Sequence, residues 1–97
     1  MPLHIESPLV ESHLLSLSAE RAVWLKLDSL QPPGSFKIRG IGLACEEYLK
    51  KGARRFVSSS GGNAGLAVAY AGRKLSTPVT VVVPESTSAR ARELLQL

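Results

Sequence analysis

At 97 residues with 44% hydrophobic content, the chain is long enough for one modest hydrophobic core and too short for a two-domain enzyme. Its formal charge of +4 comes from 12 Lys and Arg against 8 Asp and Glu, and the basic residues are dispersed rather than gathered in one tract. With aromatic residues at only 5% to stack on bases, this pattern argues against nucleic-acid binding.

The sequence shows no signal for a membrane or for secretion. No run approaches the ~20 apolar residues of a membrane span, and His4, Glu6 and Glu11 stand where a leader has a basic head and an apolar core. The single Cys45 excludes an internal disulfide, falls within a predicted helix and lacks the partners of a metal site. We therefore expect a cytoplasmic protein without a metal.

The first third of the chain predicts a short helix and then a strand. Ser7 offers a cap and Pro8 a first-turn proline for a helix that runs to Leu17. Residues 22–28 alternate apolar and polar side chains, which indicates a strand with one wetter face. The sequence Gln-Pro-Pro-Gly at residues 31–34 predicts a stiff turn that ends this strand.

The middle of the chain predicts two helices and two strands. The first helix begins at Phe36, where apolar side chains start to recur at helical spacing, and two lysines followed by Gly52 mark its end. Residues 55–58 predict a short strand, and the Ala-rich residues 63–75 predict the second helix. Residues 78–84 are β-branched and bracketed by prolines, which is typical of a buried strand of a parallel sheet.

A last helix is predicted over residues 89–97, capped by the hydroxyls of residues 86–88. Alternating strands and helices are the pattern of a parallel sheet with right-handed crossovers, so the predicted class is α/β. No later element covers the apolar face of this helix, which carries Leu94, Leu95 and Leu97. We therefore expect the chain to be an N-terminal portion of a larger protein.

One lysine stands at the predicted start of the first long helix. Ser35 can cap a helix that begins at Phe36, so Lys37 falls in its first turn. The helix dipole disfavours a second positive charge there by about 0.3–1 kcal/mol, and it therefore favours the neutral amine. A neutral amine is the nucleophile that forms an imine with an aldehyde. The alternative is an ordinary solvated lysine, and this stretch alone does not decide between the two.

The loop of residues 58–65 joins a predicted strand to a predicted helix and is made of hydroxyls and glycines. Glycines let the backbone approach a ligand, and the free N–H groups of a helix start favour an anion. The loop lacks the Gly-Lys-Ser/Thr of a Walker loop and the glycine spacing of the dinucleotide fingerprint. Asn63 adds an amide that can donate to an oxyanion or a phenolate. The alternative is a tight strand-to-helix turn, which is common in α/β units.

Taken together, Ser-Phe-Lys at 35–37 and Ser-Gly-Gly-Asn-Ala-Gly at 60–65 resemble two motifs of the serine/threonine dehydratase family of pyridoxal-phosphate enzymes. Residues 31–40 and 59–65 look most like the L-serine dehydratase and serine dehydratase-like branch, and residues 82–87 also match. The resemblance covers nearly the whole chain. It implies a fold type II architecture, similar to tryptophan synthase β, in which a parallel sheet lies between helices in three layers. Residues 1–97 are then a single N-terminal portion, in which residues 1–34 are expected to pack on a larger domain that the chain lacks.

The resemblance also implies a role for each site residue. Lys37 forms the Schiff base with pyridoxal 5'-phosphate and removes the α proton of the substrate. Phe36 packs against the cofactor ring, and Asn63 donates to its phenolic oxygen. The implied reaction is β-elimination of L-serine, secondarily of L-threonine, to a 2-keto acid and ammonia, catalysed by a cytoplasmic homodimer. The residues expected to hold the substrate carboxylate are Ser60, Gly61, Asn63 and Ala64.

Two alternatives remain beside this lyase. Serine racemases resemble the chain but usually carry a serine in place of Gly61 and a histidine in place of Ala64, so elimination is favoured over racemisation. The family binds the cofactor phosphate and the pyridine nitrogen with residues beyond 97, so we expect the chain alone to be inactive. The second alternative is a truncated, non-catalytic fragment that binds a partner or itself through the apolar face of its last helix.

Overall fold

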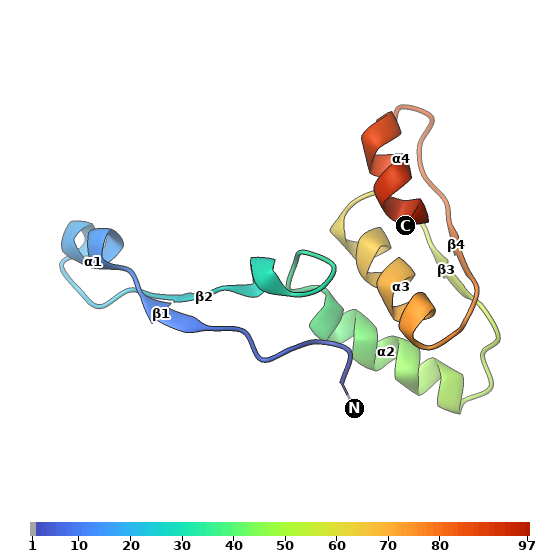
Figure 1. Cartoon of the computed structure of the whole chain (residues 1–97), viewed down its shortest axis with the longest axis horizontal. Helices are drawn as coiled ribbons and strands as arrows, with labels where there is room; N and C mark the ends of the chain where they lie inside the picture. Colours follow the sequence, from blue (N-terminus) through green and yellow to red (C-terminus); the bar gives the residue numbers. More distant parts are fainter. Residues whose placement is uncertain (1) are drawn as a thin grey trace.

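The structure is a computed structural model that describes residues 2–97, and it has the shape of a small body with a projecting N-terminal arm (Figure 1). Its principal extents are 50 × 34 × 17 Å. The mixture of helices and parallel strands confirms the predicted α/β class. The elements in chain order are β1 (Leu9–Glu11), α1 (His13–Ala19), β2 (Trp24–Lys26), the 3-10 turn η1 (Asp28–Leu30), α2 (Ile38–Lys50), β3 (Phe56–Ser58), α3 (Asn63–Lys74), β4 (Val79–Val81) and α4 (Ala89–Gln96).

The arm consists of β1, α1 and β2. Strand β1 pairs antiparallel with β2, so the helix predicted to start after Ser7 is wrong over residues 9–11. The helix begins instead at His13, because the side chain of Ser12 accepts a hydrogen bond from the Leu15 N–H at 3.2 Å. The strand predicted over residues 22–28 is present as β2, although its partner is β1 and not the parallel sheet.

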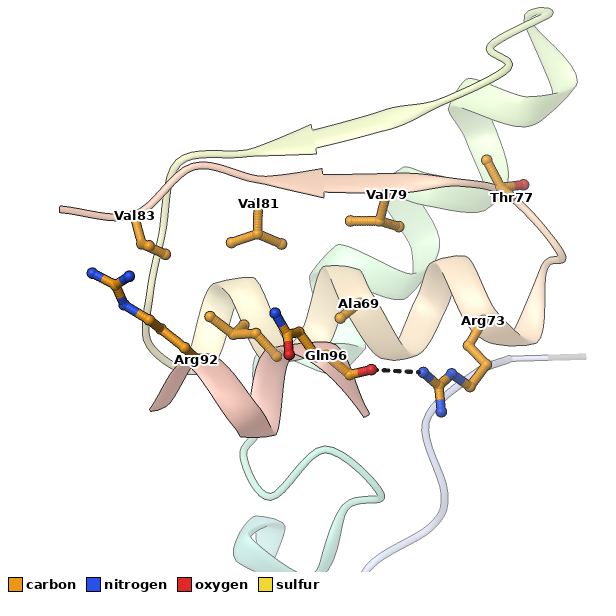
Figure 2. Close-up of a pocket in the computed structure, with 9 residues that line it drawn as sticks. Ala69, Arg73, Thr77, Val79, Val81, Val83, Arg92 and Gln96 are labelled. Atoms are coloured by element: carbon orange, nitrogen blue, oxygen red, sulfur yellow. Dashed lines mark hydrogen bonds between the residues drawn. The ribbon is translucent and has the colours of Figure 1, made fainter. Parts of the chain in front are cut away.

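The body is built on the parallel pair β3 and β4, which α3 connects. Helices α3 and α4 lie on the same face of this pair (Figure 2). Phe56 is buried against the helices, whereas Val57 on the opposite face is 69% exposed. The strand predicted within residues 78–84 is confirmed as β4, which pairs parallel with β3, but the prediction that it is buried is wrong, since residues 2–97 supply no second helix layer over Thr80 and Val82.

The core lies where α3 packs on α2 and on β3, and its buried residues are Ile38, Cys45, Phe56, Ala67 and Ala71. Burial raises the pKa of the Cys45 thiol, as expected for a cysteine that packs as a small apolar residue. The two alanines allow α2 and α3 to approach closely. At Gly72 a Cβ atom would collide with the Val79 side chain, so a glycine is what lets α3 lie against β4.

The predicted last helix is confirmed as α4, which Ser88 caps by accepting a hydrogen bond from the Ala91 N–H at 3.1 Å. Within the described residues, no helix has both the length and the apolar character needed to cross a bilayer. Likewise, residues 2–97 hold no group of three or more His, Cys, Asp or Glu side chains able to bind a metal ion.

Candidate functional site

Lys37 lies at the N-terminus of α2, as the residue immediately before the helix. The helix begins at Ile38, two residues later than predicted, because the Phe36 carbonyl accepts from the Arg39 N–H at 2.9 Å and closes a tight turn first. The predicted cap, Ser35, therefore acts on this turn: its Oγ accepts from the Lys37 N–H at 3.3 Å. Lys37 therefore lies at the start of a helix, as predicted.

The environment of Lys37 combines a fixed backbone with a free amine. Ile38, which follows the lysine, and Ser35, two residues before it, are buried, while the lysine itself is partly buried. Its amine forms no hydrogen bond or ion pair with any of residues 2–97. The neighbouring Phe36 ring is 62% exposed. An aldehyde could therefore reach this amine without displacing a hydrogen-bond partner. The exposed ring of Phe36, beside the amine, could stack on another planar group.

A polar cluster that was not predicted from the sequence ties the arm to the start of α2. We call its four members, Ser7, Asp28, Gln31 and Arg39, the Asp28 cluster. Arg39 donates from Nε to Asp28 Oδ2 at 2.9 Å and from Nη2 to Oδ1 at 3.0 Å. Ser7 and Gln31 donate to Oδ1 at 2.6 and 3.1 Å. Hydrogen bonds, first from Arg39 and then from Ser7 and Gln31, hold the pKa of Asp28 well below its usual range, and the carboxylate raises the pKa of Arg39.

The hydroxyl and glycine loop lies at the start of α3, where the helix begins at Asn63 as predicted. The residue before the helix, Gly62, has no side chain to cap it, so N–H groups of the first turn stay available to a ligand. The exposed Asn63 amide makes no hydrogen bond within residues 2–97. Ser60 Oγ, however, accepts from the Gly62 N–H at 3.2 Å and shapes the loop.

Two glycines fix the form of this loop. At Gly65 a Cβ atom would run into the carbonyl oxygen of Ser60, so the turn closes only around a glycine. At Gly61 a Cβ atom would lie 3.3 Å from Val83 Cγ1 and 3.5 Å from Thr87 Oγ1, which a small residue could occupy after a slight shift. The loop is thus packed more closely than a simple connection requires.

The predicted site residues gather at two helix starts and not in a cavity. Helices α2 and α3 both begin on the side of the body that faces the arm (Figure 1). No hydrogen bond or ion pair of the described residues joins Lys37 or Phe36 to the loop of residues 58–65. The side chains present fit three parts of pyridoxal phosphate and its substrate: a free amine for the aldehyde, an exposed aromatic ring for the pyridine, and an amide with free N–H groups for an anion.

Two cavities lie elsewhere on the body. One is an open hollow of about 530 Å³ between β4, α3 and α4, with Val79 and Val81 on one wall and Arg92 at its rim (Figure 2). The other, of about 380 Å³, lies between residues 32–34 and the two helices. Lys37 and Asn63 line neither of them.

Relatives of known name match almost the full length of the chain. A human protein named "Serine dehydratase-like" is 57% identical, and human "L-serine dehydratase/L-threonine deaminase" is 53% identical, each over 98% of this chain. The chain spans 29% of the length of either relative.

Solved structures also match almost the full length of the chain. A fungal L-serine ammonia-lyase from Rhizomucor miehei superposes with a TM-score of 0.87 at 34% identity, over 99% of this chain and 31% of that one. Maize serine racemase superposes with a TM-score of 0.88 at 25% identity, over 98% of this chain and 29% of that one. The fold is therefore shared by eliminating and racemising enzymes. The family described as "Pyridoxal-phosphate dependent enzyme" matches residues 1–97. By this match the chain belongs to the family of pyridoxal-phosphate-dependent enzymes.

Proposed function

We propose that this chain carries the N-terminal part of the active site of an ammonia-lyase that converts L-serine, and secondarily L-threonine, to a 2-keto acid and ammonia. The observation that carries the proposal is the unpaired amine of Lys37, which lies at the start of α2 next to the buried Ile38. The relatives named as serine dehydratases, at 53–57% identity, support serine as the first substrate.

Lys37 has two tasks in this proposal. Its Nζ would hold the cofactor through the cofactor's aldehyde carbon, and the cofactor when bound would supply an electron-accepting ring to the substrate Cα. Once the substrate amine has displaced it from that carbon, the same Nζ would take the proton from Cα, because it stays within reach on a fixed backbone. Phe36 covers one part of the ring, since its own ring is exposed beside the lysine.

The start of α3 binds the anionic parts. The Asn63 amide donates to the phenolic oxygen of the cofactor and to the substrate carboxylate. Free N–H groups at the helix N-terminus favour the same carboxylate, as does the positive end of the helix dipole. The residues that form this carboxylate site are Ser60, Gly61, Asn63 and Ala64.

Gly61 favours elimination over racemisation. Racemisation requires an acid on the face of the substrate opposite the lysine, and a glycine offers no side chain for this role. The racemase structure matches at 25% identity, whereas the relatives named as dehydratases match at more than 50%. The racemase-like alternative is therefore the weaker one.

The arm of β1, α1 and β2, within residues 1–34, packs on a larger domain in the complete enzyme. Its support is the apolar surface that the arm leaves uncovered, including Leu14 at 76% and Trp24 at 56% exposed. Because the chain spans 29% of its relatives, this domain and the remaining cofactor contacts belong to the proposed complete enzyme, a cytoplasmic homodimer.

A non-catalytic fragment is the second candidate, and one observation favours it. Leu94 on α4 is 40% exposed and Leu97, directly after the helix, is 72% exposed, so an apolar surface is free to bind a partner or a second copy. This candidate predicts oligomers that stay colourless with pyridoxal phosphate.

The test of the proposed function joins residues 1–97 in frame to the C-terminal part of the serine dehydratase-like relative and measures ammonia and keto acid from L-serine. We expect turnover that Lys37→Ala lowers by several orders of magnitude, since both anchor and base are lost. Comparable turnover in the Lys37→Ala chimera would contradict the role of this lysine. Formation of D-serine in place of ammonia would favour the racemase-like alternative.

A further inference from the structure

We propose that the Asp28 cluster is a positioning device that fixes Lys37 for imine formation, with Asp28 and Arg39 as its positioning residues. This inference rests on the proposed function of Lys37. Two members of the cluster, Ser7 and Asp28, lie outside the stretches that carry the resemblance to dehydratases, whereas Gln31 and Arg39 lie within residues 31–40.

The ion pair closes a loop around the lysine. Asp28 and Arg39 are 11 residues apart in sequence, and Lys37 lies inside the segment that they join. Arg39 uses two different nitrogens for two different oxygens, at 2.9 and 3.0 Å, so the pair is forked. A forked pair fixes direction as well as distance, which a single contact between long side chains does not.

Consecutive hydrogen bonds stiffen the segment inside this loop. The Gln31 N–H donates to the Asp28 carbonyl at 3.1 Å, and the Gly34 N–H donates to the Gln31 carbonyl at 2.7 Å. Ser35 Oγ then accepts from the Lys37 N–H at 3.3 Å. The path from the cluster to the lysine is therefore a series of tight turns.

Gln31 connects the same segment to the N-terminal residues that precede β1. Its side chain is 2% exposed, accepts from the Ile5 N–H at 2.8 Å and donates to the Ile5 carbonyl at 2.8 Å. The same amide nitrogen donates to Asp28 at 3.1 Å. A buried amide with its polar atoms satisfied holds one conformation, because any other leaves polar groups unpaired. The backbone that carries Lys37 is thus anchored on both sides.

The charges of the cluster balance. The Asp28 side chain is 16% exposed and accepts hydrogen bonds from three residues, while the Arg39 side chain is 35% exposed. An isolated exposed ion pair contributes little, but a forked pair within a hydrogen-bonded network has the geometry that makes such a pair effective. Removal of the Asp28 charge leaves Arg39, which lies two residues after Lys37, without its charged partner.

The experiment uses the full 97-residue chain, pyridoxal phosphate and borohydride, and maps the labelled lysines by peptide mass spectrometry. The variants are Asp28→Asn, which removes the charge, and Arg39→Lys, which keeps the charge but loses the fork. Glu47→Gln is the matched control, because it breaks an exposed pair with Lys50 at 3.5 Å at the other end of the same helix. The measured quantity is the ratio of label on Lys37 to label on the exposed Lys74.

We expect this ratio to fall about tenfold in Asp28→Asn and about threefold in Arg39→Lys, and to stay unchanged in Glu47→Gln, since misalignment of a reacting group slows reaction by such factors. A second measurement uses acetic anhydride, which reports access to the amine without a cofactor. We expect acetylation of Lys37 to stay within about twofold in all variants, because alignment with the neighbouring site does not affect it.

The outcomes separate this inference from the proposed function. Equal label ratios in wild type and variants overturn the inference alone. A parallel fall in labelling and acetylation also overturns it, because access and not alignment has then changed. Loss of the helical circular dichroism in both Asp28→Asn and Arg39→Lys overturns it as well, since the cluster then holds the fold as a whole. Absence of Lys37 label in the wild type overturns the proposed function and, with it, the inference.

Discussion

Arg39 and Asp28 form a forked ion pair across the turn that carries Lys37, with N–O distances of 2.9 and 3.0 Å. The pair brings the base of the arm and the first turn of α2 together, although the two residues belong to different predicted elements. The position of the lysine thus depends on side chains before and after it.

The first prediction concerns pH. Because hydrogen bonds from Arg39 lower the pKa of Asp28 in the folded chain, the stability that they contribute is present above the unfolded pKa of about 3.9. This stability is lost as the pH falls from about 4 toward the lower folded value. Urea unfolding should therefore show a larger loss of stability between pH 5 and pH 3 in the wild type than in Asp28→Asn, and equal losses would contradict the role of this carboxylate.

The second prediction concerns the turn at the start of α3. Gly65→Ala should destabilise the chain by about 1–3 kcal/mol, because the added Cβ atom runs into the Ser60 carbonyl oxygen and the backbone must shift. Gly62→Ala is the control, since the nearest atom to its Cβ, Ser60 Oγ, is 3.9 Å away. Urea midpoints measure both variants. A Gly65→Ala midpoint equal to that of Gly62→Ala would show that the turn is looser than described.

The third prediction concerns Asn63, whose amide is exposed and contributes little to the fold. In the chimera with the relative's C-terminal part, Asn63→Ala should lower kcat/KM for L-serine by about tenfold or more. This factor corresponds to the free energy of one hydrogen bond to a charged group. Circular dichroism should be unchanged. Unaltered kcat and KM would indicate that the loop is only a turn.

The fourth prediction tests the role of Gly61. A serine Cβ at this position lies 3.3 Å from Val83 Cγ1, so Gly61→Ser requires a slight shift of a side chain and not of the backbone. The chimera with this substitution should fold and gain D-serine formation, which chiral chromatography detects. A folded variant that forms no D-serine would show that the glycine alone does not exclude racemisation.

The body of the fold could be predicted because its signals are local. Gly52 after two lysines ends α2, Ser88 caps α4, and an Ala-rich run forms α3. Strand β1 was predicted as helix because its partner β2 lies beyond α1, and such pairing leaves no local pattern. Val82 is exposed because residues 2–97 supply no helix over that face of the strands, and the composition of the strand does not indicate whether such a helix is present.

The positions of the candidate site residues were predictable for the same reason, whereas the Asp28 cluster was not predicted. Lys37 and Asn63 stand at helix starts, which short motifs indicate. The members of the Asp28 cluster lie as far apart as Ser7 and Arg39, and only folding brings them together. Their sole sequence signal is an acid and a base on either side of a Pro-rich turn.

The central claim is that Lys37 is the lysine that carries the cofactor, and one measurement tests it most directly. The 97-residue chain is mixed with pyridoxal phosphate, its imine absorbance is recorded, and borohydride fixes the label for peptide mapping. We predict that the label is concentrated on Lys37 and that Lys37→Arg loses both the absorbance and this peptide. Label spread over exposed lysines such as Lys50 and Lys74, with the same absorbance in Lys37→Arg, would contradict the claim.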